Sequence, residues 1–135
     1  MERFILGELL KWKESSSRKS LILRGSRQVG KSYIVRELGK HFDNFVEVNF
    51  EKDLSLAQIF DGDLEPVKII EKISAVKNMP VIPGGTLLFL DEIQAAPRAV
   101  TALRYFYELM PELHVISAGS LLEFALEKTG MPVGR

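Results

Sequence analysis

The stretch that decides the fold runs from Gly25 to Ser32 and has the sequence GSRQVGKS. It matches every fixed position of the pattern G-x-x-x-x-G-K-[ST]. The short apolar run Leu21–Leu23 precedes it and predicts a buried strand, and helical spacing of apolar residues follows it from Ser32 to His41. An ordinary Gly-rich turn between a strand and a helix is the alternative. The strand before the pattern and the helix after it favour a phosphate-binding loop.

The residue types of this loop suit a triphosphate. Gly25 allows a sharp exit from the strand, and Gly30 lets the backbone approach the phosphates without a Cβ in the way. The loop amides and the helix N-terminus turn their positive ends toward the anion. Lys31 supplies a charge to the β- and γ-phosphates, and the Ser32 hydroxyl is a ligand for Mg²⁺. The sequence therefore predicts binding of ATP with Mg²⁺ by Gly25, Ser26, Arg27, Gln28, Val29, Gly30, Lys31, Ser32 and Tyr33.

A second motif, LLFLDE, consists of an apolar run from Leu87 to Leu90 followed by Asp91 and Glu92. Two acids at the carboxyl end of a buried strand lie where open α/β sheets bind ligands. We predict that Asp91 binds Mg²⁺ opposite Ser32, and that Glu92 is the catalytic base for the attacking water. The alternative is a strand that ends in solvated acids.

A fourth predicted strand, Leu113–Ile116, is followed by Ser117-Ala118-Gly119-Ser120. If this strand lies between the other two, a hydroxyl at its tip reaches the γ-phosphate and bonds the attacking water. Ser117 and Ser120 are both candidates for this catalytic role. Ser120 is also suited to cap the next helix, and the two roles are compatible.

The remaining segments alternate between helical and strand-like patterns, which predicts an α/β domain with a mainly parallel sheet. We expect one domain, residues 1–135, with an N-terminal helix and joint over 1–19 and the core over 20–135. Further elements are predicted at Phe4–Trp12 (helix), Phe45–Phe50 (strand), Leu54–Met79 (interrupted helix), Pro80–Gly85 (turn), after Pro97 (helix) and at Leu121–Leu126 (helix).

Composition excludes several kinds of site. The 135 residues contain no cysteine, so disulfides, thiolate metal sites and cysteine nucleophiles are ruled out. The formal net charge is +0, which gives no electrostatic footprint for a nucleic acid or an anionic membrane. No apolar run is long enough to cross a bilayer. We expect a cytoplasmic protein with no membrane partner.

These motifs resemble the AAA+ superfamily. The resemblance rests on RGSRQVGKSYIVREL, LLFLDEIQAAPRAVTALRYFYE, LHVISAGSLLEFAL and MPVGR, and it covers residues 4–135. More narrowly, the chain is similar to predicted prokaryotic ATPases that join an N-terminal AAA-type domain to a C-terminal domain of unknown function. The resemblance implies a three-layer fold with parallel strands in the order 5-1-4-3-2 and helices on both faces. It assigns Lys31 and Ser32 to the phosphate-binding loop, Asp91 and Glu92 to magnesium and water activation, and Ser117 or Ser120 to the polar sensor.

The family pattern continues beyond Arg135 into a fifth strand, a helical lid and the C-terminal domain. We therefore expect a chain truncated before strand five, in which strand one lies at the sheet edge. The resemblance implies an arginine finger from a neighbouring subunit, and hence a homo-oligomer of the full-length protein. Arg135 is the candidate finger, ahead of Arg98 and Arg104. The client molecule, protein or nucleic acid, stays open.

The function that follows is Mg²⁺-dependent ATP hydrolysis in the motor or switch core of a larger AAA+ protein, slow in the isolated chain. A nucleotide-gated interaction module without appreciable turnover is the alternative. A small-molecule phosphotransferase is a third hypothesis, which Glu92 disfavours because a kinase has reason to avoid activating water.

Overall fold

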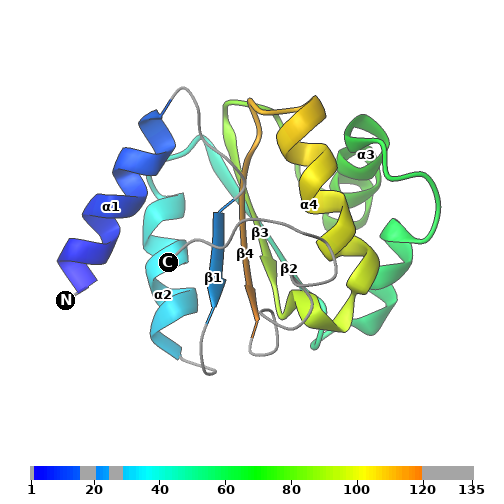
Figure 1. The fold of residues 1–135 in the computed structure, drawn as a ribbon, viewed down its shortest axis with the longest axis horizontal. Coiled ribbons are helices and arrows are strands. Elements are labelled where there is room, and N and C mark those ends of the chain that lie inside the picture. The colour runs from blue at the N-terminus through cyan, green and yellow to red at the C-terminus, as the bar shows by residue number, and fades with distance from the viewer. Residues whose placement is uncertain (1, 16–20, 25–28, 120–135) are drawn as a thin grey trace.

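The computed structural model describes residues 2–15, 21–24 and 29–119. Strands and helices alternate along these residues, as the sequence predicts (Figure 1). The elements are α1 (Glu2–Glu14), β1 (Leu21–Arg24), α2 (Val29–Gly39), β2 (Asn44–Asn49), η1 (Leu54–Phe60), α3 (Pro66–Lys77), β3 (Thr86–Asp91), η2 (Ile93–Ala95), α4 (Pro97–Leu109) and β4 (His114–Gly119).

The four strands form one sheet in the order β1-β4-β3-β2, and every pair is parallel. The predicted α/β class is confirmed, and so is the position of β4 between β1 and β3. Because all strands run the same way, their carboxyl ends lie along one edge, the lower edge in Figure 1. The residues that follow the strands therefore gather at that edge.

Helices cover both faces of the sheet, which makes three layers. On one face, α1 and α2 pack through Leu9, Val35 and Leu38 against Phe89 of β3 and Ile116 of β4. On the other face, α3 and α4 enclose the larger core. Each buried aliphatic or aromatic side chain contributes about 1.5–3 kcal/mol. The core on the α3 and α4 face includes Val46, Val48, Leu88, Leu90, Val115, Ile69, Ile73, Leu103 and Phe106.

Two element boundaries differ from the predictions by three residues. Helix α2 begins at Val29 and not at Ser32, so its first turn includes part of the predicted phosphate-binding motif. The predicted interruption between Leu54 and Met79 is confirmed: the segment divides into η1 and α3, because Pro66 starts a new helix at its first position. Strand β4 extends to Gly119 and not to Ile116, because it pairs with β1 up to Arg24. The predicted helix at Leu121–Leu126 lies outside the described residues.

Candidate functional site

Three side chains from different elements meet at the carboxyl edge of the sheet. Asp91 is the last residue of β3, and Asn49 is its register partner on β2. Ser32 lies in the first part of α2. Its Oγ donates a hydrogen bond to Asp91 Oδ2 at 3.2 Å, and Asn49 Nδ2 lies 3.5 Å from the same oxygen. The two residues predicted to hold magnesium are therefore in direct contact.

Asp91 is a carboxylate with little access to water, since 7% of the residue is exposed. Burial raises the pKa of Asp91 above its ordinary value of 3.8. Hydrogen bonds from the Glu92 N–H and the Ser32 hydroxyl oppose this rise in pKa, whereas the nearby carboxylates of Glu92 and Glu47 add to it. A cation beside Asp91 would offset the cost of keeping the buried carboxylate charged.

The donor atoms at this place fit Mg²⁺. A carboxylate oxygen and a hydroxyl oxygen are hard ligands, and magnesium sites commonly use one or two protein ligands together with water and substrate phosphates. Among residues 2–15, 21–24 and 29–119, no group of three or more His, Asp or Glu side chains is arranged to hold a metal. The Ser32–Asp91 pair thus fits a magnesium site in which phosphate oxygens and water would supply the remaining ligands.

Glu92 follows Asp91 in a left-handed backbone conformation, with φ 52° and ψ 48°. This conformation is uncommon for a residue with a Cβ, and such residues cluster at functional sites. The Glu92 N–H donates to Asp91 Oδ1 at 2.9 Å, which ties the turn to the end of β3. The Glu92 carboxylate accepts a hydrogen bond from Gln94 Nε2 at 2.8 Å. Its orientation is therefore fixed by a neighbour within the same turn.

The structure does not bring Ser117 to this edge. Ser117 is fully buried within β4 and pairs with Leu90, whose side chain packs toward α4. Paired residues share a face of the sheet, so Ser117 faces α4 while Asp91 faces α2. Ser117 also lies two residues, or about 6–7 Å, before the end of β4 at Gly119. The predicted sensor role is therefore not supported for Ser117, and Ser120, the other candidate, lies outside the described residues.

The backbone of α2 begins at this edge. Gly30 and Lys31 lie in its first turn, where unpaired N–H groups and the helix dipole favour an anion. Tyr33, at the start of the next turn, is 49% exposed. Of the other predicted site residues, Gly25, Ser26, Arg27, Gln28 and Arg135 lie outside the described residues, as do the side chains of Val29 and Lys31.

The two weaker arginine-finger candidates lie on α4. Arg98 donates to the carbonyl oxygens of Phe60 at 2.8 Å and Gly62 at 2.7 Å. This guanidinium therefore joins α4 to the end of η1, which is a structural role. Arg104 is exposed on the same helix.

Comparison with known families agrees with this geometry. A family model described as "AAA domain" matches residues 17–135. The chain belongs to the AAA domain family. This family consists of nucleotide-binding P-loop ATPases, so the pairing of Ser32 with Asp91 lies in a domain that belongs to an ATPase family. Helix α1 precedes the matched region.

This AAA domain also resembles a solved structure, the Walker-type ATPase of Pyrococcus abyssi. The TM-score is 0.59 at 17% sequence identity, and the match covers 96% of this chain and 50% of that one. The chain thus spans about half the length of this structural relative, and the likeness supports the shared fold. A comparison with curated proteins gave no match. None of the described helices is long and apolar enough to cross a membrane.

Sequence reasoning assigned no role to two residues of the AAA domain's site. Asn49 ends β2 beside Asp91, and its Oδ1 also accepts from the backbone N–H groups of Glu51 and Lys52 at 3.0 Å each. Gln94 holds the Glu92 carboxylate. A polar residue at the end of a predicted strand was the available signal for Asn49. Gln94 lies within the stretch LLFLDEIQAAPRAVTALRYFYE that carries the family resemblance, but its contact partner could not be foreseen from the sequence.

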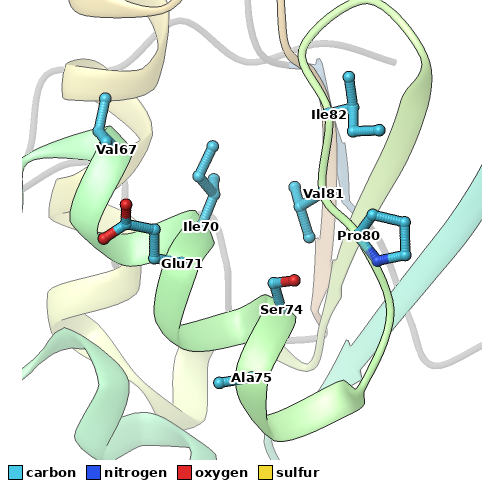
Figure 2. Close-up of a pocket in the computed structure, with 8 residues that line it drawn as sticks. All are labelled: Val67, Ile70, Glu71, Ser74, Ala75, Pro80, Val81 and Ile82. Atoms are coloured by element: carbon cyan, nitrogen blue, oxygen red, sulfur yellow. The ribbon is translucent and has the colours of Figure 1, made fainter.

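Among the surface grooves lined by described residues, two differ in their relation to the site. One, of about 440 Å³, includes Asn49 and Arg36 and so borders the site. Figure 2 shows the other, of about 460 Å³, where Ile70 of α3 lies opposite Val81. The segment around Val81 leads into the start of β3 at Thr86. The second groove therefore lies away from the carboxyl edge and takes no part in the site.

Proposed function

We propose that this AAA domain binds ATP together with Mg²⁺ and hydrolyses it to ADP and phosphate. The observation that carries the proposal is the 3.2 Å contact between Ser32 Oγ and Asp91 Oδ2. It joins the phosphate-binding motif to the acidic end of β3 at one edge of the sheet. Such a junction is the arrangement that a P-loop ATPase uses to hold the magnesium ion of its nucleotide.

Each residue of the motifs has a role in this proposal. The amides of the loop and of the first turn of α2 bind the phosphate oxygens, and Lys31 neutralises charge on the β- and γ-phosphates. Ser32 and Asp91 would hold the metal ion, which, when bound, stabilises negative charge on the transferred phosphoryl group. Asn49 keeps Asp91 in place from the neighbouring strand.

Glu92 is the proposed catalytic base. Its carboxylate orients the attacking water and accepts its proton, while the water oxygen bonds to the γ-phosphorus and the bond to ADP breaks. The Gln94 hydrogen bond limits the positions that this carboxylate can adopt. Ser120 is the remaining candidate for a hydroxyl that bonds the same water.

In the full-length protein we propose that this domain is the ATP-driven core of a homo-oligomer. An arginine from a neighbouring subunit, with Arg135 the candidate in this chain, would stabilise the transition state. A positioned arginine is worth about 10³–10⁵ in rate. The chain alone should therefore bind ATP and hydrolyse it slowly.

The test compares Lys31→Ala and Glu92→Gln with the parent chain. We expect Lys31→Ala to weaken ATP affinity by about tenfold or more, because a charge-assisted contact is lost. Glu92→Gln should keep the affinity and lower phosphate release by about 10²–10⁴. Isothermal titration measures binding, and a phosphate-release assay measures turnover.

Exposed residues of the same type supply the controls. Lys72→Ala and Glu108→Gln should match the parent in both assays, because both side chains lie on helix surfaces away from the site. If Glu92→Gln hydrolyses ATP as fast as the parent, Glu92 is not the base. Tight binding without phosphate release, also in the full-length protein, would support a nucleotide-gated interaction module instead.

A further inference from the structure

The Gln94 amide has a defined orientation. Its Nε2 donates to Glu92 Oε1 at 2.8 Å. A carboxylate can only accept hydrogen bonds, so the NH₂ group must face Glu92 and the amide oxygen must face away. The direction of the amide is thus set by chemistry as well as by the coordinates.

The amide oxygen of Gln94 points toward the tip of β4. A Cβ at Gly119, the last residue of β4, would lie 2.0 Å from Gln94 Oε1 and 3.2 Å from Gln94 Cδ. Any other residue at position 119 would force the Gln94 amide to move. Gln94 therefore fills a space between the turn after β3 and the end of β4.

This placement is unfavourable for stability by itself. Gln94 Oε1 is buried, and no donor among the described residues bonds it. A buried acceptor without a donor loses its water and gains nothing in return. An apolar side chain of similar length, such as methionine, would fill the same space without that loss. The remaining benefit of glutamine is the hydrogen bond that it donates to Glu92.

We propose that Gln94 is a positioning residue that holds Glu92 for the attack of water, with its amide held against the tip of β4. The proposal rests on the proposed ATPase function of Glu92. The Glu92 side chain has several rotatable bonds and starts from a left-handed turn. A second anchor is therefore needed to keep its carboxylate in one place. Misplacement of a reacting group by about 1 Å can lower a rate by up to about 10².

The first test is Gln94→Met, with Gln58→Met as the control on the exposed surface of η1. We expect kcat to fall by about tenfold while KM and ATP affinity change less than about twofold, because only orientation is lost. The midpoint of thermal unfolding should stay the same or rise, because the unpaired acceptor is removed. An unchanged kcat would overturn the proposal. So would a fall in kcat that comes with a lower unfolding midpoint, because Gln94 would then be a structural residue.

A second measurement does not depend on turnover. The chain has three glutamines, Gln28, Gln58 and Gln94, so its glutamine side-chain amide signals are few in an ¹H–¹⁵N spectrum. The Gln94 pair is identified by its absence in Gln94→Met. We expect Glu92→Ala to shift the Gln94 pair toward the position of a free amide and to leave the Gln58 pair in place.

These results separate the two proposals. Gln94 signals that do not move in Glu92→Ala would show that no such hydrogen bond exists, and would overturn the inference even if Glu92 is the base. If neither the parent chain nor the full-length protein releases phosphate, the proposed function fails. The amide signals would then still decide whether Gln94 holds Glu92.

Discussion

Gly119→Ala tests the contact between the two strand ends most directly. The new methyl carbon would lie 2.0 Å from Gln94 Oε1, whereas ordinary contact begins at 3.4 Å. The amide oxygen must therefore retreat by 3.4 − 2.0 = 1.4 Å. The opposite end of the same amide already lies 2.8 Å from Glu92 Oε1, and hydrogen bonds weaken beyond about 3.2 Å. A displacement of this size breaks or distorts the bond to Glu92.

The expected cost in the free energy of unfolding is about 1–3 kcal/mol, the usual range for overpacking a filled site. Turnover should fall by about tenfold, as in Gln94→Met, because the base loses the same anchor. Gly7→Ala is the matched control. No atom lies within 4 Å of its new methyl group, and alanine in a helix is favoured over glycine by up to about 1 kcal/mol.

A double-mutant cycle with Gln94→Ala isolates the contact. Once the long side chain is gone, Gly119→Ala should cost less than about 0.5 kcal/mol, which corresponds to a coupling of about 0.5–3 kcal/mol. Urea unfolding gives the stabilities, and phosphate release gives the rates. If Gly119→Ala costs the same in both backgrounds, the methyl group does not meet Gln94, and the reasoning from this geometry is refuted.

Two further predictions concern Asp91 and the N-terminal helix. Burial raises the pKa of the Asp91 carboxyl in the folded chain, so the folded state holds the Asp91 proton more tightly than the unfolded state does. The protonated carboxyl therefore stabilises the fold at acid pH. This stabilisation is lost as the pH rises from 3.8 through the pKa of the folded state. In buffer without magnesium or nucleotide, the unfolding midpoint of Asp91→Asn should therefore rise relative to that of the parent as the pH goes from acid to neutral. A difference in midpoint that shrinks over this range would contradict the raised pKa of Asp91. Leu9→Ala should lower the free energy of unfolding in urea by about 2–5 kcal/mol, because Leu9 is 3% exposed within the core shared by α1, α2 and the sheet. This effect is expected although the family match begins after α1. Leu54→Ala is its control, since Leu54 is 66% exposed and should change stability by less than about 0.5 kcal/mol; equal effects of the two would show that α1 is not part of the folded unit.

Local patterns in the sequence determined the fold class and the residue types that lie at the carboxyl edge of the sheet. The strand–turn–helix pattern around Gly25–Ser32 and the apolar run before Asp91 each depend on neighbours along the chain. Both indicated a parallel sheet with a phosphate-binding edge, and the structure places Ser32 against Asp91 at that edge. Alternation and helical spacing also predicted most elements, because burial on one face imposes a period on adjacent residues.

Tertiary structure decided which face and which partner each side chain has. Ser117 looked suited to the site, but its pairing with Leu90 turns it toward α4, because a sheet face is set by strand register and not by the nearest residues in sequence. Asn49 reaches Asp91 because β2 pairs with β3, and the Gln94 amide lies against Gly119 because two strand ends converge. Local sequence specifies the type of each element. Contacts between residues distant in sequence exist only once the sheet has fixed the order and register of its strands.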